Sequence, residues 1–131
     1  MIITNHEQGW DSKVNFTDSK DVFVGYDTYA SCCEHAGWFI SESSETNYEC
    51  SANYEDREQE SKALVDGYKF DTSFFHELDG DNLEDGGQVC FKLVKDGEKD
   101  LFLHLFNSHN GYYNHGFEAK VGGEVWKQGC I

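Results

Sequence analysis

Cysteine and histidine side chains, which bind transition metals and carry out acid–base chemistry, gather at two places in the chain. The first is the run SCCEHAGWFI, where Cys32, Cys33 and His35 lie close together in sequence. Such a run could supply two or three ligands to a zinc ion. It lacks the paired C-x-x-C spacing typical of zinc sites, and adjacent cysteines on a strand face opposite sides. The alternative is that both thiols are buried as small hydrophobic side chains.

The second place is residues 100–118, DLFLHLFNSHNGYYNHGFE, which contain three of the six histidines, His104, His109 and His115. If these side chains approach one another, they could hold a metal ion that activates water, or form an acid–base pair. The simpler interpretation is that His104 is a hydrogen-bonded sheet residue and that the other two lie in a loop. The sequence contains no G-x-S-x-G, H-E-x-x-H or P-loop motif. We therefore assign no catalytic residue and no cofactor, and keep a zinc site built from both clusters as the alternative.

The elements around these histidines are predicted from hydrophobic periodicity. Residues 101–106 are apolar on both alternating faces, which predicts a central strand buried on both sides. Asn110 and Gly111 form a turn signal because both residues tolerate positive φ. Aromatic residues then favour a return strand over residues 112–121. We therefore predict a β-hairpin whose loop, residues 108–111, brings the three histidines to one end of a sheet.

Other strand signals predict a mainly antiparallel sheet that ends in a C-terminal meander. Gly25 interrupts one of these strands and marks a bulge or a close backbone approach. A polar run at residues 95–98 predicts a tight turn into the central strand. The remaining strands are expected at residues 1–4, 13–17, 22–26, 89–94 and 125–127.

Two short helices are predicted in the middle of the chain. One spans residues 54–65 with Asn53 as its cap, and the other spans residues 71–78 with Asp71 as its cap. The fold class that we predict is therefore α+β, mostly β. A chain of 131 residues suggests a single domain, residues 1–131.

The net charge of −15 bears directly on possible partners. Residues 41–85 carry fourteen acidic residues against three basic ones, a net charge of −11. Direct binding to nucleic acid or to an anionic membrane is disfavoured, because phosphate contacts need Lys and Arg. A basic protein surface is favoured, and solubility alone is the simpler alternative. The residues assigned to partner binding are Glu55, Asp56, Glu58, Glu60, Asp79, Asp81, Glu84, Asp85, Tyr112 and Tyr113.

Residues 29–40, YASCCEHAGWFI, and residues 109–118, HNGYYNHGFE, resemble a family of small uncharacterised domains of bacteria and their phages. The resemblance covers about a sixth of the chain and implies a mobile-element setting, with no catalytic residue to transfer. Together with the charge it suggests an inhibitor of a host nucleic-acid-binding or defence protein, of the anti-CRISPR or anti-restriction type. Such an inhibitor would present carboxylates in place of phosphates.

A plainer hypothesis is an interaction module in which Tyr112 and Tyr113 contact a protein or a glycan. Residues 1–10 have neither the basic nor the apolar region of a signal peptide, and the sequence has no run of roughly 18 apolar residues that could span a membrane. We therefore expect a cytoplasmic protein, within the host cell if a phage encodes it. Its five cysteines would then be reduced.

Overall fold

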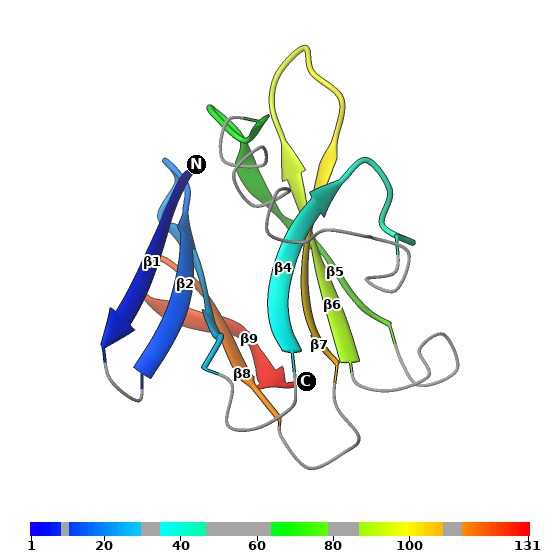
Figure 1. The fold of residues 1–131 in the computed structure, drawn as a ribbon. Helices are drawn as coiled ribbons and strands as arrows, with labels where there is room; N and C mark the ends of the chain where they lie inside the picture. Colours follow the sequence, from blue (N-terminus) through cyan, green and yellow to red (C-terminus); the bar gives the residue numbers. More distant parts are fainter. Residues whose placement is uncertain (9–10, 30–34, 47–63, 79–86, 109–113) are drawn as a thin grey trace.

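The computed structural model describes residues 1–8, 11–29, 35–46, 64–78, 87–108 and 114–131. The described chain forms two antiparallel sheets that make up two layers (Figure 1). Blue, orange and red strands form one layer, and cyan, green and yellow strands form the other. The mainly antiparallel β architecture that the sequence predicts is confirmed.

The first layer is a five-stranded sheet with the order β1-β2-β3-β8-β9. Neighbouring strands are antiparallel throughout, and β8 pairs with β3 although many residues separate them in the sequence. The strands are β1 (Ile2–Gln8), β2 (Asp11–Thr17), β3 (Val22–Asp27), β8 (Gly116–Val121) and β9 (Glu124–Cys130).

The second layer is a four-stranded sheet with the order β4-β7-β6-β5. Its last three strands in sequence form a meander, and β4 lies beside β7, which is a Greek-key arrangement. The strands are β4 (His35–Ser41), β5 (Lys69–Leu78), β6 (Gly87–Val94) and β7 (Leu101–Ser108).

One hydrophobic core joins the two sheets. Residues of β3 alternate between buried and half-buried positions, so one face of the five-stranded sheet points into the core. Phe16 meets Trp38 of the opposite sheet edge-on, with ring centroids 5.1 Å apart. The buried Tyr26 hydroxyl donates a 2.6 Å hydrogen bond to the carbonyl oxygen of Phe106, which also crosses between the sheets.

Asp18 is a second link between the layers. Its carboxylate is buried and accepts hydrogen bonds from the backbone N–H groups of Lys20 and Val22 in the β2–β3 turn. The other oxygen accepts a 2.9 Å hydrogen bond from the N–H of Phe70 in β5. One side chain thus shapes a turn of one sheet and holds a strand of the other.

The predicted hairpin over residues 101–121 is wrong. β7 pairs with β4 and β6, whereas β8 pairs with β3 and β9 in the other sheet. The connection between β7 and β8 therefore crosses from one layer to the other. β7 is buried on both faces, as predicted, but its two neighbours are strands other than the one that follows it.

The predicted helix at residues 71–78 is also wrong, because this segment belongs to β5. The Asp71 carboxylate does accept a hydrogen bond from the N–H of Ser73, which is the local pattern of a helix cap. Here that pattern accompanies a β-bulge between Asp71 and Phe75. Of the predicted helix at residues 54–65, only the last two positions lie within the described chain.

No helix in the described ranges is long and apolar enough to cross a membrane.

Candidate functional site

The outward face of the five-stranded sheet contains a depression at Gly25. This residue lies in the middle of β3, opposite Asn15 of β2 and Glu118 of β8. A Cβ atom built on Gly25 would lie 3.0 Å from Cε1 of Phe23 and 3.2 Å from Oδ1 of Asn15. The Phe23 ring and the Asn15 amide therefore pack over the glycine, and only glycine fits without displacing them.

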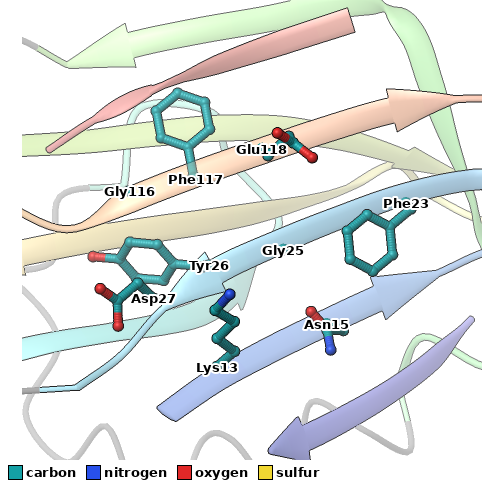
Figure 2. Close-up of a pocket in the computed structure, with 9 residues that line it drawn as sticks. All are labelled: Lys13, Asn15, Phe23, Gly25, Tyr26, Asp27, Gly116, Phe117 and Glu118. Atoms are coloured by element: carbon teal, nitrogen blue, oxygen red, sulfur yellow. The ribbon is translucent and has the colours of Figure 1, made fainter. Parts of the chain in front are cut away.

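A hollow of about 390 Å³ opens at this position. Gly25 and Gly116 contribute backbone without side chains to its lining, and the Phe23 ring and the Asn15 amide lie beside Gly25 (Figure 2). Polar residues of three neighbouring strands, β2, β3 and β8, complete the lining, so the three strands together form one site. The polar side chains that line the hollow are Lys13, Asn15, Asp27 and Glu118.

Charges of both signs are balanced around the hollow. Glu118 pairs with Lys120 on its own strand, with Oε1 and Nζ 3.0 Å apart. Asp27 uses Oδ1 to accept the backbone N–H of Tyr29. Lys13 is exposed, and no ion pair of its ammonium is found within the described residues. The hollow thus offers an ammonium donor, carboxylate acceptors and an amide beside an aromatic ring.

His104 lies in a different cluster, on the outward face of the four-stranded sheet, and is completely buried. The Gln88 side-chain nitrogen is 2.7 Å from the carbonyl oxygen of Thr46 and 2.9 Å from Nδ1 of His104. A carbonyl oxygen can only accept, so this atom of Gln88 is the amide nitrogen, and it donates to both groups. Nδ1 of His104 is therefore the acceptor, and the proton of the neutral ring is on Nε2.

Nε2 of His104 then donates toward Ser41 Oγ at 2.8 Å and the carbonyl oxygen of Ser43 at 3.1 Å. The Ser41 hydroxyl donates to the same Ser43 carbonyl at 2.7 Å. Histidine thus acts as a donor and not as a base toward this serine, which is not the arrangement of an activated nucleophile. Burial lowers the pKa of His104 to about 4, and the ring stacks on Phe39 with centroids 4.5 Å apart.

His115 lies just before β8 in the other layer, far from His104 in the topology of the sheets. It is buried, and Nδ1 donates a 2.7 Å hydrogen bond to the carbonyl oxygen of Asp27. His35 is exposed at the start of β4 and its ring is 5.7 Å from that of Phe106. The hairpin that would have gathered the histidines does not exist, so the structure does not bring His104 and His115 together through it.

The structure describes only three of the six predicted metal ligands: His35, His104 and His115. Within the described chain, no three His, Cys, Asp or Glu side chains are placed to hold one ion. His109, Cys32 and Cys33 lie outside the described residues, so a zinc site that includes them stays a prediction. Every residue assigned to partner binding from the sequence also lies outside the described residues, so that assignment stays a prediction as well. These residues are Glu55, Asp56, Glu58, Glu60, Asp79, Asp81, Glu84, Asp85, Tyr112 and Tyr113.

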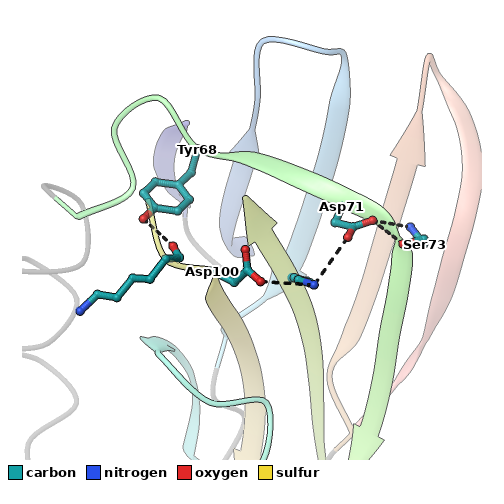
Figure 3. A network of polar contacts seen from close by, with 6 residues as sticks. Tyr68, Asp71, Ser73 and Asp100 are labelled. Atoms are coloured by element: carbon teal, nitrogen blue, oxygen red, sulfur yellow. Dashed lines mark hydrogen bonds and ion pairs between the residues drawn. The ribbon is translucent and has the colours of Figure 1, made fainter. Parts of the chain in front are cut away.

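A third polar cluster lies on the surface of the four-stranded sheet (Figure 3). Lys92 Nζ is 3.9 Å from Asp71 and 3.4 Å from Asp100, and the Tyr68 hydroxyl donates to the Lys99 carbonyl at 2.9 Å. Ion pairs that remain partly open to solvent, as these do, contribute little to stability.

A hollow of about 450 Å³ is lined by Tyr68, Lys95 and Lys99. Both of its lysines are already engaged, because Lys95 donates to the Asp66 carbonyl at 3.1 Å and Lys99 pairs with Glu42. Its two lysines therefore differ from Lys13 of the hollow at Gly25, whose ammonium has no ion pair within the described residues.

Comparison with protein-family models, with curated proteins and with solved structures found no match for this chain. Its function is therefore inferred from the sites themselves.

Sequence reasoning missed the residues of the hollow at Gly25, although it singled out Gly25 as a position of close approach. The signal that points to them is a glycine in the middle of a strand, with an aromatic residue two positions before it. The polar residues Lys13 and Asn15 alternate with buried Val14 and Phe16 in β2, which places them on the outward face.

Proposed function

We propose that this protein is a binding protein whose recognition site is the hollow at Gly25 on the outward face of the five-stranded sheet. The observation that carries the proposal is the lining of this hollow, where three aromatic residues, Phe23, Tyr26 and Phe117, and four polar residues surround two glycines. Ligand sites commonly combine such an apolar surface with a few convergent polar groups. The site lies on paired strands, which hold these groups in fixed positions.

A catalytic role for the cluster around His104 has less support. In the hydrogen bond between His104 and Ser41 the histidine is the donor, whereas a general base would accept the serine proton. The ring is also buried, and its nitrogens are engaged by hydrogen-bond partners. The groups at Gly25 are instead accessible from solvent, and their proposed role needs no proton transfer.

A ligand-observed NMR screen of a small-molecule fragment library tests this proposal. We expect fragments that bind the wild-type protein to lose binding to Phe23→Ala and to Lys13→Gln, because each variant removes one lining side chain. Val125→Ala and Lys20→Gln are matched controls, since both positions are exposed and neither lines the hollow. Hits that bind all four variants equally would contradict the proposal.

A second candidate is recognition of a basic protein surface by residues 41–85, with their net charge of −11. This charge concentration favours fast association with a Lys- and Arg-rich partner, such as a nucleic-acid-binding defence protein. Charge reversal of Glu55, Asp56, Glu58 and Glu60 should then abolish capture of the partner and its salt dependence. Capture that is unchanged and insensitive to salt would rule this candidate out.

A further inference from the structure

We infer that the hollow at Gly25 takes a neutral, hydroxyl-rich ligand, that is, a saccharide. This inference rests on the proposed function and names the class of ligand for the same site. Lys13 lines the hollow together with Asp27 and Glu118, and Lys120 beside it pairs with Glu118. These four formal charges cancel, although the whole chain has a net charge of −15.

The donor and acceptor pattern favours hydroxyl groups. Lys13 can only donate, the carboxylates of Asp27 and Glu118 can only accept, and the Asn15 amide does both. A hydroxyl group both donates and accepts, so neighbouring hydroxyls of one ligand can satisfy all of these side chains. A ligand with only donors or only acceptors would leave some of them desolvated without a partner, which is costly.

The Phe23 ring supplies the apolar part of the site. It is half-buried and packs over Gly25 beside the Asn15 amide, so the ring itself forms part of the wall of the hollow. A sugar ring carries C–H groups on one face and hydroxyls at its edge, and aromatic side chains accommodate such amphipathic surfaces. The volume of about 390 Å³ lies at the lower end of small-molecule sites, which suits one or two sugar units.

Other ligand classes fit less well. A phosphate or a nucleotide would meet the carboxylates of Asp27 and Glu118 and the negative field of the whole chain. A basic peptide would meet the ammonium of Lys13. A lipid chain would cover four polar side chains without satisfying their hydrogen bonds.

The test is an NMR titration of the full chain with neutral disaccharides, namely cellobiose, maltose, lactose and N,N′-diacetylchitobiose, and with glucose 6-phosphate as the charged comparison. We expect at least one disaccharide to bind, and to bind more tightly than the phosphate. Phe23→Ala and Asn15→Ala should each weaken binding about tenfold, as the loss of one central contact does. Val125→Ala should leave the affinity within about twofold, the range expected for a residue outside the contact surface.

Two outcomes would overturn the inference. If fragments bind at Gly25 but no disaccharide does, the ligand class is wrong and the site stands. If disaccharides bind equally to wild type and Phe23→Ala, they bind elsewhere, and the inference fails. Amide spectra of each variant show whether it is folded, and Phe23→Leu, which keeps an apolar side chain but no aromatic face, replaces Phe23→Ala if that variant unfolds.

Discussion

His104 is neutral at physiological pH because it is buried and both ring nitrogens already have hydrogen-bond partners. Protonation at Nδ1 would place an N–H against the amide nitrogen of Gln88, which is itself a donor. Desolvation is the main cause of the lowered pKa, and the nearby charge of His76 adds to it. Both polar atoms of this buried side chain are therefore satisfied only when the ring is neutral.

The stability of the protein should fall as the pH drops because of this histidine. The pKa of His104 is about 4 when folded and near its ordinary 6.5 when unfolded. Between these values the unfolded chain binds a proton that the folded chain does not, so acid favours unfolding. The loss from pH 7 to pH 4 should be on the order of 3 kcal/mol.

Urea unfolding of wild type and His104→Gln across this pH range measures the effect. The difference between the two free energies of unfolding isolates His104 from the carboxylates, which titrate in both proteins. We expect the wild type to lose more stability than the variant as the pH falls. Parallel pH profiles would show that the pKa of His104 is the same in the folded and unfolded chains, which would contradict its lowering by burial.

Two cysteines of the described chain should differ widely in reactivity. Cys90 is completely buried, and burial raises the pKa of its thiol to about 12, whereas Cys130 is exposed. Because the thiolate is the reactive form, iodoacetamide should modify Cys130 at least about 100-fold faster than Cys90. Peptide mass spectrometry of a labelling time course measures both rates, with urea-unfolded protein as the control. Similar rates in the native protein would contradict the buried position of Cys90.

At the scale of elements, Asp18 shows how one side chain holds two sheets in place. It satisfies backbone N–H groups of Lys20 and Val22 on one side and of Phe70 on the other. Each buried N–H left without a partner costs about 1–3 kcal/mol.

Asp18→Ala should therefore destabilise the protein by several kcal/mol, on the order of 3. Asp18→Asn should cost less, because its oxygen can keep the two bonds within the turn. Urea unfolding at pH 7 measures both, and Asp96→Ala in the exposed turn after β6 is the matched control. If Asp18→Ala were as stable as Asp96→Ala, the hydrogen bonds of Asp18 would not contribute to the free energy of unfolding.

Most strands could be predicted from the sequence because their alternation is local. β2, β3, β6 and β7 each show the pattern of one or two buried faces, and all four are strands. Strand pairing could not be predicted, because it depends on which distant segment completes each sheet. β7 and β8 are neighbours in sequence, yet they belong to different layers.

The prediction at β5 failed for a local reason. Asp71 and Ser73 form a hydrogen-bond pattern shared by helix caps and by bulged strands. Phe74 and Phe75 settle the choice, because Phe74 contacts Phe102 and Phe75 contacts Phe91 on the opposite face of the sheet. Adjacent aromatic residues with two different packing partners fit a strand with period two.

The candidate site at Gly25 was hidden from the sequence because it depends on strand pairing. Its lining comes from β2, β3 and β8, and Glu118 reaches the site only because β8 returns to pair with β3. The histidine cluster, in contrast, depended on a hairpin that the fold does not contain.

Across the whole molecule, the two sheets differ in how far their outward faces are buried. The four-stranded sheet buries Phe39, His104 and Phe106 on its outward face, so this face also serves packing. The five-stranded sheet leaves its outward face open, with alternating polar side chains and a charge-balanced hollow.

Chemical-shift mapping of bound ligand on the ¹⁵N-labelled protein tests directly whether ligands bind at Gly25. We expect disaccharide or fragment ligands to shift the backbone amides of Lys13, Asn15, Gly25, Asp27 and Glu118. Amides of β5 and β6 in the other layer should stay unchanged. Shifts concentrated in the four-stranded sheet, with those five amides unmoved, would contradict a recognition site at Gly25.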